Sequence, residues 1–322
     1  MILDFEKPIK LLNDKLDELK KLYQQKEDTS LGETIKTLSE KIKTLTWNTF
    51  KNISSWQKVQ VARHSDRPYT LDYINLMVQD FIEIHGDRLQ GDDKTIIGGL
   101  GKIDGKTIMF IGHQKGGDLR ERQKRNFWMA SPCGYRKSLR LMKMAEHFEV
   151  PVVIFIDMPG ANLNIDSEKF GIAEAIAKNL QAMVKINVPL ISFVIGEGGS
   201  GGALALAMGD KIFMLENSWF SVISPESAAT ILCKNSDYKE QMSMMLHLTA
   251  KEMLELKIID DIVNEPLGGV HSNISEMSKI LKIKILKEIR DLERHKRSLL
   301  KNRWNKYLTL NDGIEKIFMH KK

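Results

Sequence analysis

The feature that most restricts the fold of this chain is a run of glycines that directly follows an apolar segment. Residues 188–210 read VPLISFVIGEGGSGGALALAMGD. Five glycines are clustered at residues 196–202: Gly196, Gly198, Gly199, Gly201 and Gly202. Apolar, β-branched residues before them and small helix formers after them predict a buried strand, a tight turn and a short helix. Because glycine has no Cβ and the first amides of a helix are unpaired, this turn favours close approach of an anion.

One motif in this run is typical of dinucleotide-binding domains. Gly196, Gly198 and Gly201 fit G-x-G-x-x-G, and the next predicted strand, residues 211–215, is followed by Glu216. In a Rossmann-type dehydrogenase that acid would bind the ribose of NAD. The match leaves an NAD-binding enzyme open as an alternative.

A second motif is typical of serine hydrolases. Ser200 is the central residue of G-x-S-x-G, with His247 or His271 as a candidate base.

A third interpretation is an oxyanion hole, in which backbone amides stabilise a developing negative charge without a nucleophilic side chain. No Lys-Ser or Lys-Thr follows the glycines, which excludes a Walker phosphate loop.

Composition narrows the class of protein. The 322 residues are 42% hydrophobic and 28% charged, as in globular proteins, and no apolar run reaches bilayer-spanning length. Cys133 and Cys233 form neither a disulfide framework nor a zinc motif. The N-terminus resembles neither a signal nor a transit peptide, so we expect the protein to stay where it is made. The net charge of +6 and the lack of a nucleic-acid-binding motif indicate no specific nucleic acid partner.

The first 46 residues have the pattern of two amphipathic helices. Apolar residues recur at alternating steps of four and three: Leu12, Leu16, Leu19, Tyr23, then Leu31, Ile35, Leu38, Ile42 and Leu45. This narrow stripe predicts a helical hairpin with little core of its own, which packs on the main body or on a partner.

Beyond residue 98, predicted strands alternate with predicted helices. Strands are expected at residues 106–111, 150–156 and 211–215 besides the glycine-terminated one, and helices at 135–148 and 167–184. This alternation predicts an α/β fold with a mostly parallel sheet and ligands at the carboxyl ends of the strands.

A short internal sequence repeat, the internal echo of residues 150–160 and 188–198, predicts a second glycine turn beside the first. VPVVIFID from Val150 aligns with VPLISFVI from Val188, and the same offset places Gly160 on Gly198. Two adjacent turns would present two sets of backbone N–H groups to a ligand, whereas a dinucleotide site needs only one such set. The echo therefore favours the oxyanion-hole interpretation.

Longer motifs give the chain a family resemblance. They are WQKVQVARHSDRPYTLDYI at 56–74, GHQKG at 112–116, GYRKSLRLMK at 134–143, GEGGSGGALA at 196–205, SVISPE at 221–226 and EPLGG at 265–269. In this order they resemble the alpha subunit of the carboxyltransferase component of acetyl-CoA carboxylase, over residues 47–273. The resemblance implies a crotonase-like α/β fold of repeated ββα units.

Three regions are expected from this resemblance and from the helical patterns at each end. They are an N-terminal helical arm at residues 1–46, a crotonase-like carboxyltransferase domain at 47–275 and a basic helical extension at 276–322. Within the extension, residues 280–306 predict one amphipathic helix with a solvated basic face.

The resemblance also implies an activity and a set of site residues. A carboxyl group would pass from carboxybiotin, on a biotin carrier protein, to acetyl-CoA to give malonyl-CoA for fatty acid biosynthesis. The backbone oxyanion hole would be formed by Gly201 and Gly202 with Gly198 and Gly199. The residues expected to bind substrate are Gly160, Ala161, Lys115, Arg125 and Lys137. We expect Gly202→Val to abolish transfer with the fold nearly intact, and Ser200→Ala to retain most activity.

The same resemblance implies a set of partners. It implies an α2β2 hetero-oligomer with a beta subunit of similar fold that carries zinc and holds the thioester oxygen, and no metal in this chain. The biotin carboxyl carrier protein and biotin carboxylase would complete the complex, in the bacterial cytoplasm or the plastid stroma, with no membrane contact. Gly117, Cys133 and Asn162 depart from the family pattern and change the expected pocket wall.

Overall fold

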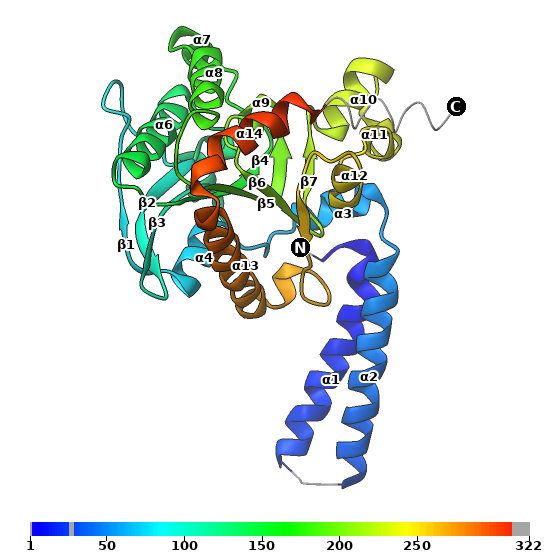
Figure 1. Cartoon of the computed structure of the whole chain (residues 1–322). Coiled ribbons are helices and arrows are strands. Elements are labelled where there is room, and N and C mark those ends of the chain that lie inside the picture. The colour runs from blue at the N-terminus through cyan, green and yellow to red at the C-terminus, as the bar shows by residue number, and fades with distance from the viewer. Residues whose placement is uncertain (1, 26–28, 311–322) are drawn as a thin grey trace.

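A computed structural model describes residues 2–25 and 29–310 and contains one eight-stranded sheet (Figure 1). The strands succeed one another across the sheet in the order β1-β2-β3-β4-β5-β6-β8, and β7 pairs with the far end of β5. Their bounds are β1 Gln79–Glu83, β2 Ile96–Ile103, β3 Lys106–His113, β4 Val152–Met158, β5 Leu190–Gly199, β6 Lys211–Leu215, β7 Trp219–Ser221 and β8 Asp261–Val263. The predicted strands are therefore present, and β6 has the predicted ends.

Strand direction divides the sheet into two parts. Strands β1, β2 and β3 pair with one another in antiparallel fashion, whereas the pairs β3–β4, β4–β5, β5–β6 and β6–β8 are parallel. Parallel strands require crossover connections, which the helices between them provide. The predicted α/β class with a mostly parallel sheet is confirmed.

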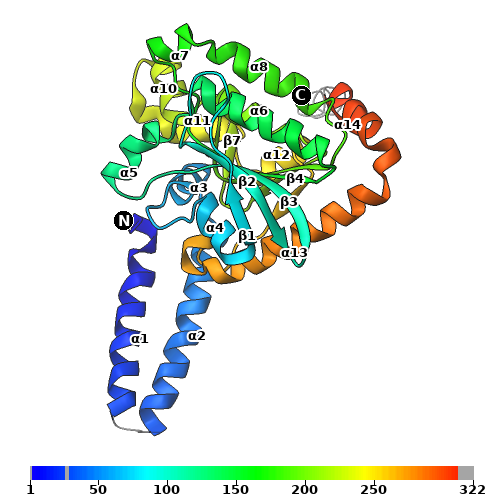
Figure 2. The same ribbon diagram turned by 90° about the vertical axis from the view of Figure 1, so that its left-hand side faces the viewer.

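Helices cover both faces of the sheet (Figure 2), and an apolar core lies between the sheet and the helices on each face. In β4, Val152, Ile154 and Ile156 face one core, and Val153 and Phe155 face the other, which is the period of two expected for a strand buried on both faces. The first core is closed by α6 Pro132–His147, α8 Ile172–Met183, α9 Ser200–Leu204 and α12 Ala250–Glu255. The second is closed by α4 Thr70–Met77 and α13 Ile274–Arg294.

Glycine explains one difference from the prediction. The single helix expected at residues 167–184 is two helices, α7 Ile165–Lys169 and α8, because Gly171 between them has φ of 76°. Such a left-handed residue ends one helix and lets the chain start another.

The N-terminal residues form the predicted helical hairpin. Helices α1 Lys7–Gln25 and α2 Thr29–Lys51 project away from the sheet (Figures 1 and 2). Ile9, Leu16 and Ile42 form the centre of their small apolar contact. Helix α2 continues past the expected boundary at residue 46 to Lys51, and α3 Ser55–Ala62 then leads to the sheet.

The C-terminal region is tied closely to the core. The single helix expected at residues 280–306 is two, α13 and α14 Leu299–Leu308, and the apolar side of α13 completes the second core. The last part of the predicted extension, residues 311–322, lies outside the described residues. The remaining α-helices of the described residues are α5 Leu119–Lys124, α10 Pro225–Cys233 and α11 Lys239–Met245. Within residues 2–25 and 29–310, no helix has the length and apolar character needed to cross a membrane.

Candidate active site

Two glycine turns meet at the carboxyl end of the parallel strands. The first, Pro159-Gly160-Ala161, comes after β4, and the second lies where β5 ends at Gly199 and α9 begins at Ser200. A Cβ on Gly202 would lie 2.8 Å from the Ala161 nitrogen, so the two turns are in contact. The adjacency expected from the internal echo is present, at the edge of the sheet where parallel strands bind ligands.

The offset of the internal echo matches the pairing of β4 with β5 but does not hold in the turns that follow them. Val152 pairs with Leu190 and Ile156 with Val194, which keeps the expected offset, but Met158 then pairs with Gly198. Gly160 therefore does not lie opposite Gly198. The difference arises because β5 contains extra residues just before the turn.

The second turn is open on one side and closed on the other. A Cβ on Gly201 would meet no heavy atom within 4 Å, and Ser200 is exposed. A Cβ on Gly202 would instead lie 2.6 Å from the Tyr135 hydroxyl and 2.7 Å from Met158 Cε. The first turn has the same openness, since nothing lies within 4 Å of a Cβ on Gly160. A ligand can thus reach the amides at the start of α9 from the side of Gly201 and Gly160.

This geometry corrects one expectation about variants. Gly202 is buried, so Gly202→Val would push against Tyr135 and the backbone of Ala161 and cannot leave the fold nearly intact. At Gly201, in contrast to Gly202, a Cβ would enter open space.

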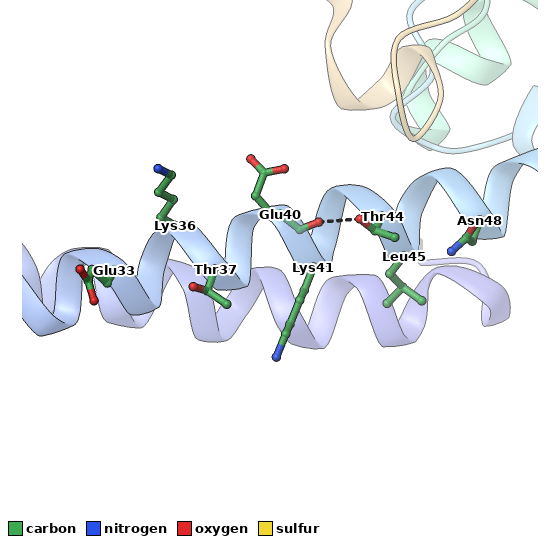
Figure 3. A pocket seen from close by; sticks show the side chains of 8 residues that line it. All are labelled: Glu33, Lys36, Thr37, Glu40, Lys41, Thr44, Leu45 and Asn48. Carbon is green, nitrogen blue, oxygen red and sulfur yellow. Dashed lines mark hydrogen bonds between the residues drawn. The ribbon is translucent and has the colours of Figure 1, made fainter.

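A cavity of about 360 Å³ opens beside the first turn. Its lining includes Arg63, Tyr69, Lys115, Arg122, Trp128 and Pro159. A larger hollow of about 840 Å³ lies along α2, where Lys36, Glu40 and Asn48 are exposed on the outside of the arm (Figure 3). That hollow has no glycine turn or buried charge among its lining residues, so the cavity beside Pro159 is the better candidate for a ligand.

Lys115 belongs to a buried group of charges below the turns. Its Nζ lies 2.6 Å from Asp157 Oδ1 and 2.8 Å from Glu197 Oε1. The other oxygen of Glu197 lies 2.7 Å from Arg63 Nε, and Arg63 also pairs with Glu226. Asp157 and Glu197 are adjacent to the two turns in sequence, so this group connects them from below.

The charge states of this group result from burial and pairing. Burial works against the charge on Lys115, but attraction by Asp157 and Glu197 raises its pKa. Burial raises the pKa of Asp157, which Lys115 partly opposes. Burial also disfavours ionised Glu197, yet Lys115 and Arg63 hold its pKa below the usual value. Lys115 is therefore a charged residue with two buried partners.

The other two basic residues expected to bind substrate have structural partners. Lys137 is fully buried on α6, and its Nζ lies 2.5 Å from Asp92 Oδ1 and 2.7 Å from the Asp93 carbonyl. Arg125 donates to the Lys94 carbonyl and pairs with Glu121. Lys137 has no exposed surface with which to meet a substrate, so its expected role is corrected to holding the loop before β2.

The two alternative motifs do not have the geometry they require. Gly196 and Gly198 lie within β5 rather than in a turn between strand and helix, and Glu216 accepts a bond from the Glu265 N–H. Candidate bases for Ser200 are engaged elsewhere: His247 Nδ1 lies 3.1 Å from Glu252 and His271 Nε2 lies 3.0 Å from Glu6.

Sequence reasoning missed the acids under the turns. Asp157 and Glu197 are almost fully buried on strands that are otherwise apolar. A charged residue at the end of an apolar strand is itself a signal, because a buried carboxylate needs a partner. That partner, Lys115, lies in the GHQKG motif, where the sequence indicated only a role in substrate binding.

Known proteins are similar to this chain in fold and, in a separate set, in sequence. The transcarboxylase 12S structure superposes with a TM-score of 0.54 at 17% identity, covering 69% of this chain and 44% of the transcarboxylase chain, so this chain spans under half of that one. A Pseudomonas malonate decarboxylase hetero-tetramer gives 0.54 at 14% identity, covering 72% of this chain and 93% of that chain. The fold is that of the crotonase-like carboxyltransferases, as expected.

Sequence comparison identifies the family within that class. The family model described as acetyl co-enzyme A carboxylase carboxyltransferase-like matches residues 2–311. Two relatives are named acetyl-coenzyme A carboxylase carboxyl transferase subunit alpha. The one from Chlorobium limicola is 48% identical to this chain, over 91% of this chain and 92% of the relative. The one from Histophilus somni is 47% identical, over 95% of this chain and 97% of the relative. The chain belongs to this family of carboxyltransferase alpha subunits. The dehydrogenase and serine hydrolase interpretations are therefore wrong.

Proposed function

We propose that this chain provides the biotin side of carboxyl transfer from carboxybiotin to acetyl-CoA. The amides of Gly201 and Gly202, with the turn formed by Gly198 and Gly199, would stabilise the ureido oxygen of biotin as negative charge develops on it. The observation that carries this proposal is the open approach to the amides at the start of α9, beside Gly160. Gly160 and Ala161 would line the same opening.

The reaction needs no nucleophile from the protein. The bond between biotin N1 and the carboxyl carbon breaks, a new bond forms from that carbon to C2 of acetyl-CoA, and the C2 proton passes to biotin N1. Negative charge develops on the ureido oxygen and on the thioester oxygen, so two oxyanion sites are required. Malonyl-CoA and free biotin on its carrier are the products.

The second oxyanion site is proposed to lie on a beta subunit. We expect an α2β2 complex in which the beta subunit binds the thioester oxygen and carries zinc, supplied with carboxybiotin by the biotin carboxyl carrier protein and biotin carboxylase. The expected location, bacterial cytoplasm or plastid stroma, stays a prediction. The chain alone should be inactive, and deletion of residues 1–46 should weaken assembly with the beta subunit more than it weakens the folded core.

Gly201→Val tests the proposed role of the amides. The new side chain enters space that contains no protein atom within 4 Å, so we expect the complex to assemble normally. Malonyl-CoA formation should fall about 10²–10³-fold, the usual cost of losing one oxyanion donor. Gly91→Val is the matched control, since Gly91 is equally open but lies in the loop before β2. Activity of Gly201→Val within a few-fold of wild type would contradict the proposal.

A further inference from the structure

Strand β5 contains a bulge directly before the second glycine turn. Between the pairs Ile156 with Val194 and Met158 with Gly198, β4 has one residue, Asp157, whereas β5 has three, residues 195–197. At the same place β5 exchanges β6 for β7 as its neighbour. A bulge bends a strand and re-aims the residues after it, so this one sets where the amides beyond Gly199 lie relative to Gly160.

Side chains pair with the backbone groups of the bulge. The Glu197 N–H donates to Asp157 Oδ1 at 2.8 Å, and the Ile195 carbonyl accepts from Arg67 Nε at 2.8 Å. A Cβ on Gly196 would lie 2.8 Å from Asp157 Cγ, so the carboxylate occupies the space that a side chain there would need. Without Asp157, the bulge would have a buried N–H without a partner and an empty space beside it.

Lys115 makes the buried carboxylate possible. Asp157 is 1% exposed and Glu197 2% exposed, and the Lys115 ammonium lies between them at 2.6 and 2.8 Å. Two carboxylates this close cannot both stay ionised in a buried site without a cation. Because Lys115 comes just after β3, a single ammonium joins the carboxyl ends of β3, β4 and β5.

We propose that Lys115 and Asp157 are positioning residues for carboxyl transfer, because they hold the bulge in β5 that aims the amides of Gly201 and Gly202. The inference rests on the proposed function, since it takes those amides as the oxyanion donors. A displacement of about 1 Å at such donors can reduce a rate about 10²-fold, so the effect belongs to turnover rather than to substrate binding.

The test uses the assembled alpha–beta complex and compares two substitutions at one position. Asp157→Ala removes the acceptor for the Glu197 N–H but leaves Lys115 paired with Glu197, so no charge is left alone. We expect kcat to fall about 10²-fold with KM for acetyl-CoA unchanged. Asp157→Asn keeps an acceptor oxygen at the same place and should retain kcat within about tenfold. Equal kcat values for the Ala and Asn variants would overturn the role of Asp157.

A second pair of variants tests Lys115. Lys115→Met leaves Asp157 without its cation and should lower kcat to the same extent, whereas Lys115→Met with Asp157→Asn removes the extra charge and should restore most of it. A loss that the double variant does not restore, with a raised KM, would mean that Lys115 contacts substrate directly and would overturn the inference. If Lys115→Met fails to assemble, the double variant and the Asp157 pair still decide.

Stability and the proposed function are separated by controls. Arg303→Met removes an equally buried ion pair, with Asp210, near the opposite end of β5, so it should lower the melting temperature without lowering kcat. If Gly201→Val is fully active while Asp157→Ala is not, the oxyanion assignment fails. If Gly201→Val is inactive while Asp157→Ala is active, the positioning inference fails.

Discussion

The backbones of Gly199 and Pro159 are in direct contact. A Cβ on Gly199 would overlap the carbonyl group of Pro159 and would lie 3.1 Å from the Gly160 nitrogen. The end of β5 thus packs against the turn after β4 without a side chain between them. Backbone atoms cannot move aside as the end of a flexible side chain can. This contact fixes the spacing of the two turns.

Gly199→Ala should therefore destabilise the chain and lower activity together. Overpacking of a tightly packed site costs about 1–3 kcal/mol, and relief requires the two turns to separate. Urea unfolding and a malonyl-CoA assay of the complex would measure both effects. Gly201→Ala is the control for stability, and we expect a change of under about 0.5 kcal/mol, as at open surface positions. A Gly199→Ala chain as stable as wild type would argue against the contact.

Ser200→Ala should retain activity within a few-fold. Ser200 has φ of 59°, a left-handed conformation that alanine tolerates no worse than serine, and its two candidate bases are bonded to Glu6 and Glu252. Steady-state malonyl-CoA formation by the complex is the measurement. Complete loss of turnover in a correctly assembled variant would support a nucleophilic serine instead.

His113 should make the chain less stable in mild acid. Burial, and then the charge of Lys115, lower the pKa of His113 to about 3, whereas an unfolded histidine titrates near 6.5. The unfolded state therefore binds a proton first, and stability that is present above pH 6.5 is lost as the pH falls toward 3, by up to about 1.4 kcal/mol per pH unit. Denaturant unfolding at pH 7 and pH 5 of wild type and His113→Leu would show it. The same pH slope in both would contradict the assignment.

Arg303 should contribute strongly to stability and not to catalysis. Its guanidinium is fully buried, pairs with Asp210 at 2.6 Å and donates to the carbonyls of Met183, Ile186 and Val188. Arg303→Met would leave a buried carboxylate and three carbonyls without that donor, at a cost of about 3–5 kcal/mol. Chemical denaturation would show this loss. A variant of unchanged stability would mean that α14 does not anchor the chain in solution.

Glu6, His64 and His271 should not bind a metal in this arrangement, although their ligand atoms lie within 4.8 Å of one another. The two imidazoles are stacked, with centroids 4.0 Å apart and planes 17° apart, so one ion cannot lie in the plane of both rings. The Asp66 N–H donates to His64 Nδ1, which places the proton of neutral His64 on Nε2, the atom facing Glu6. Zinc or EDTA should leave the melting temperature unchanged, and a clear shift with zinc would contradict this.

Glu6 instead fastens the arm to the body. Burial disfavours its charge, but hydrogen bonds from His271 and the Leu3 N–H lower its pKa. Its contacts with His64 and His271 connect the start of α1 with residues that precede α4 and α13.

Much of the chain could be predicted from local pattern. Runs of apolar, β-branched residues indicated the buried strands, glycine and small residues indicated the turn before α9, and the leucine stripe indicated the arm. These signals are local because each depends on dihedral preference and on which side of one element is apolar. The motifs around Lys115, Lys137 and Gly201 also indicated the family that the comparisons identify.

Only the tertiary structure decided what the buried charges do. Lys115, Asp157 and Glu197 are separated by tens of residues and meet because β3, β4 and β5 are neighbours in register, which no local pattern encodes. The same holds for Lys137, whose partner Asp92 lies on a distant loop. The bulge in β5 likewise appears only once β4 supplies the opposing register. A buried charge is stable only where a partner lies within a few ångströms, and that distance is a property of the packed sheet rather than of the sequence around either residue.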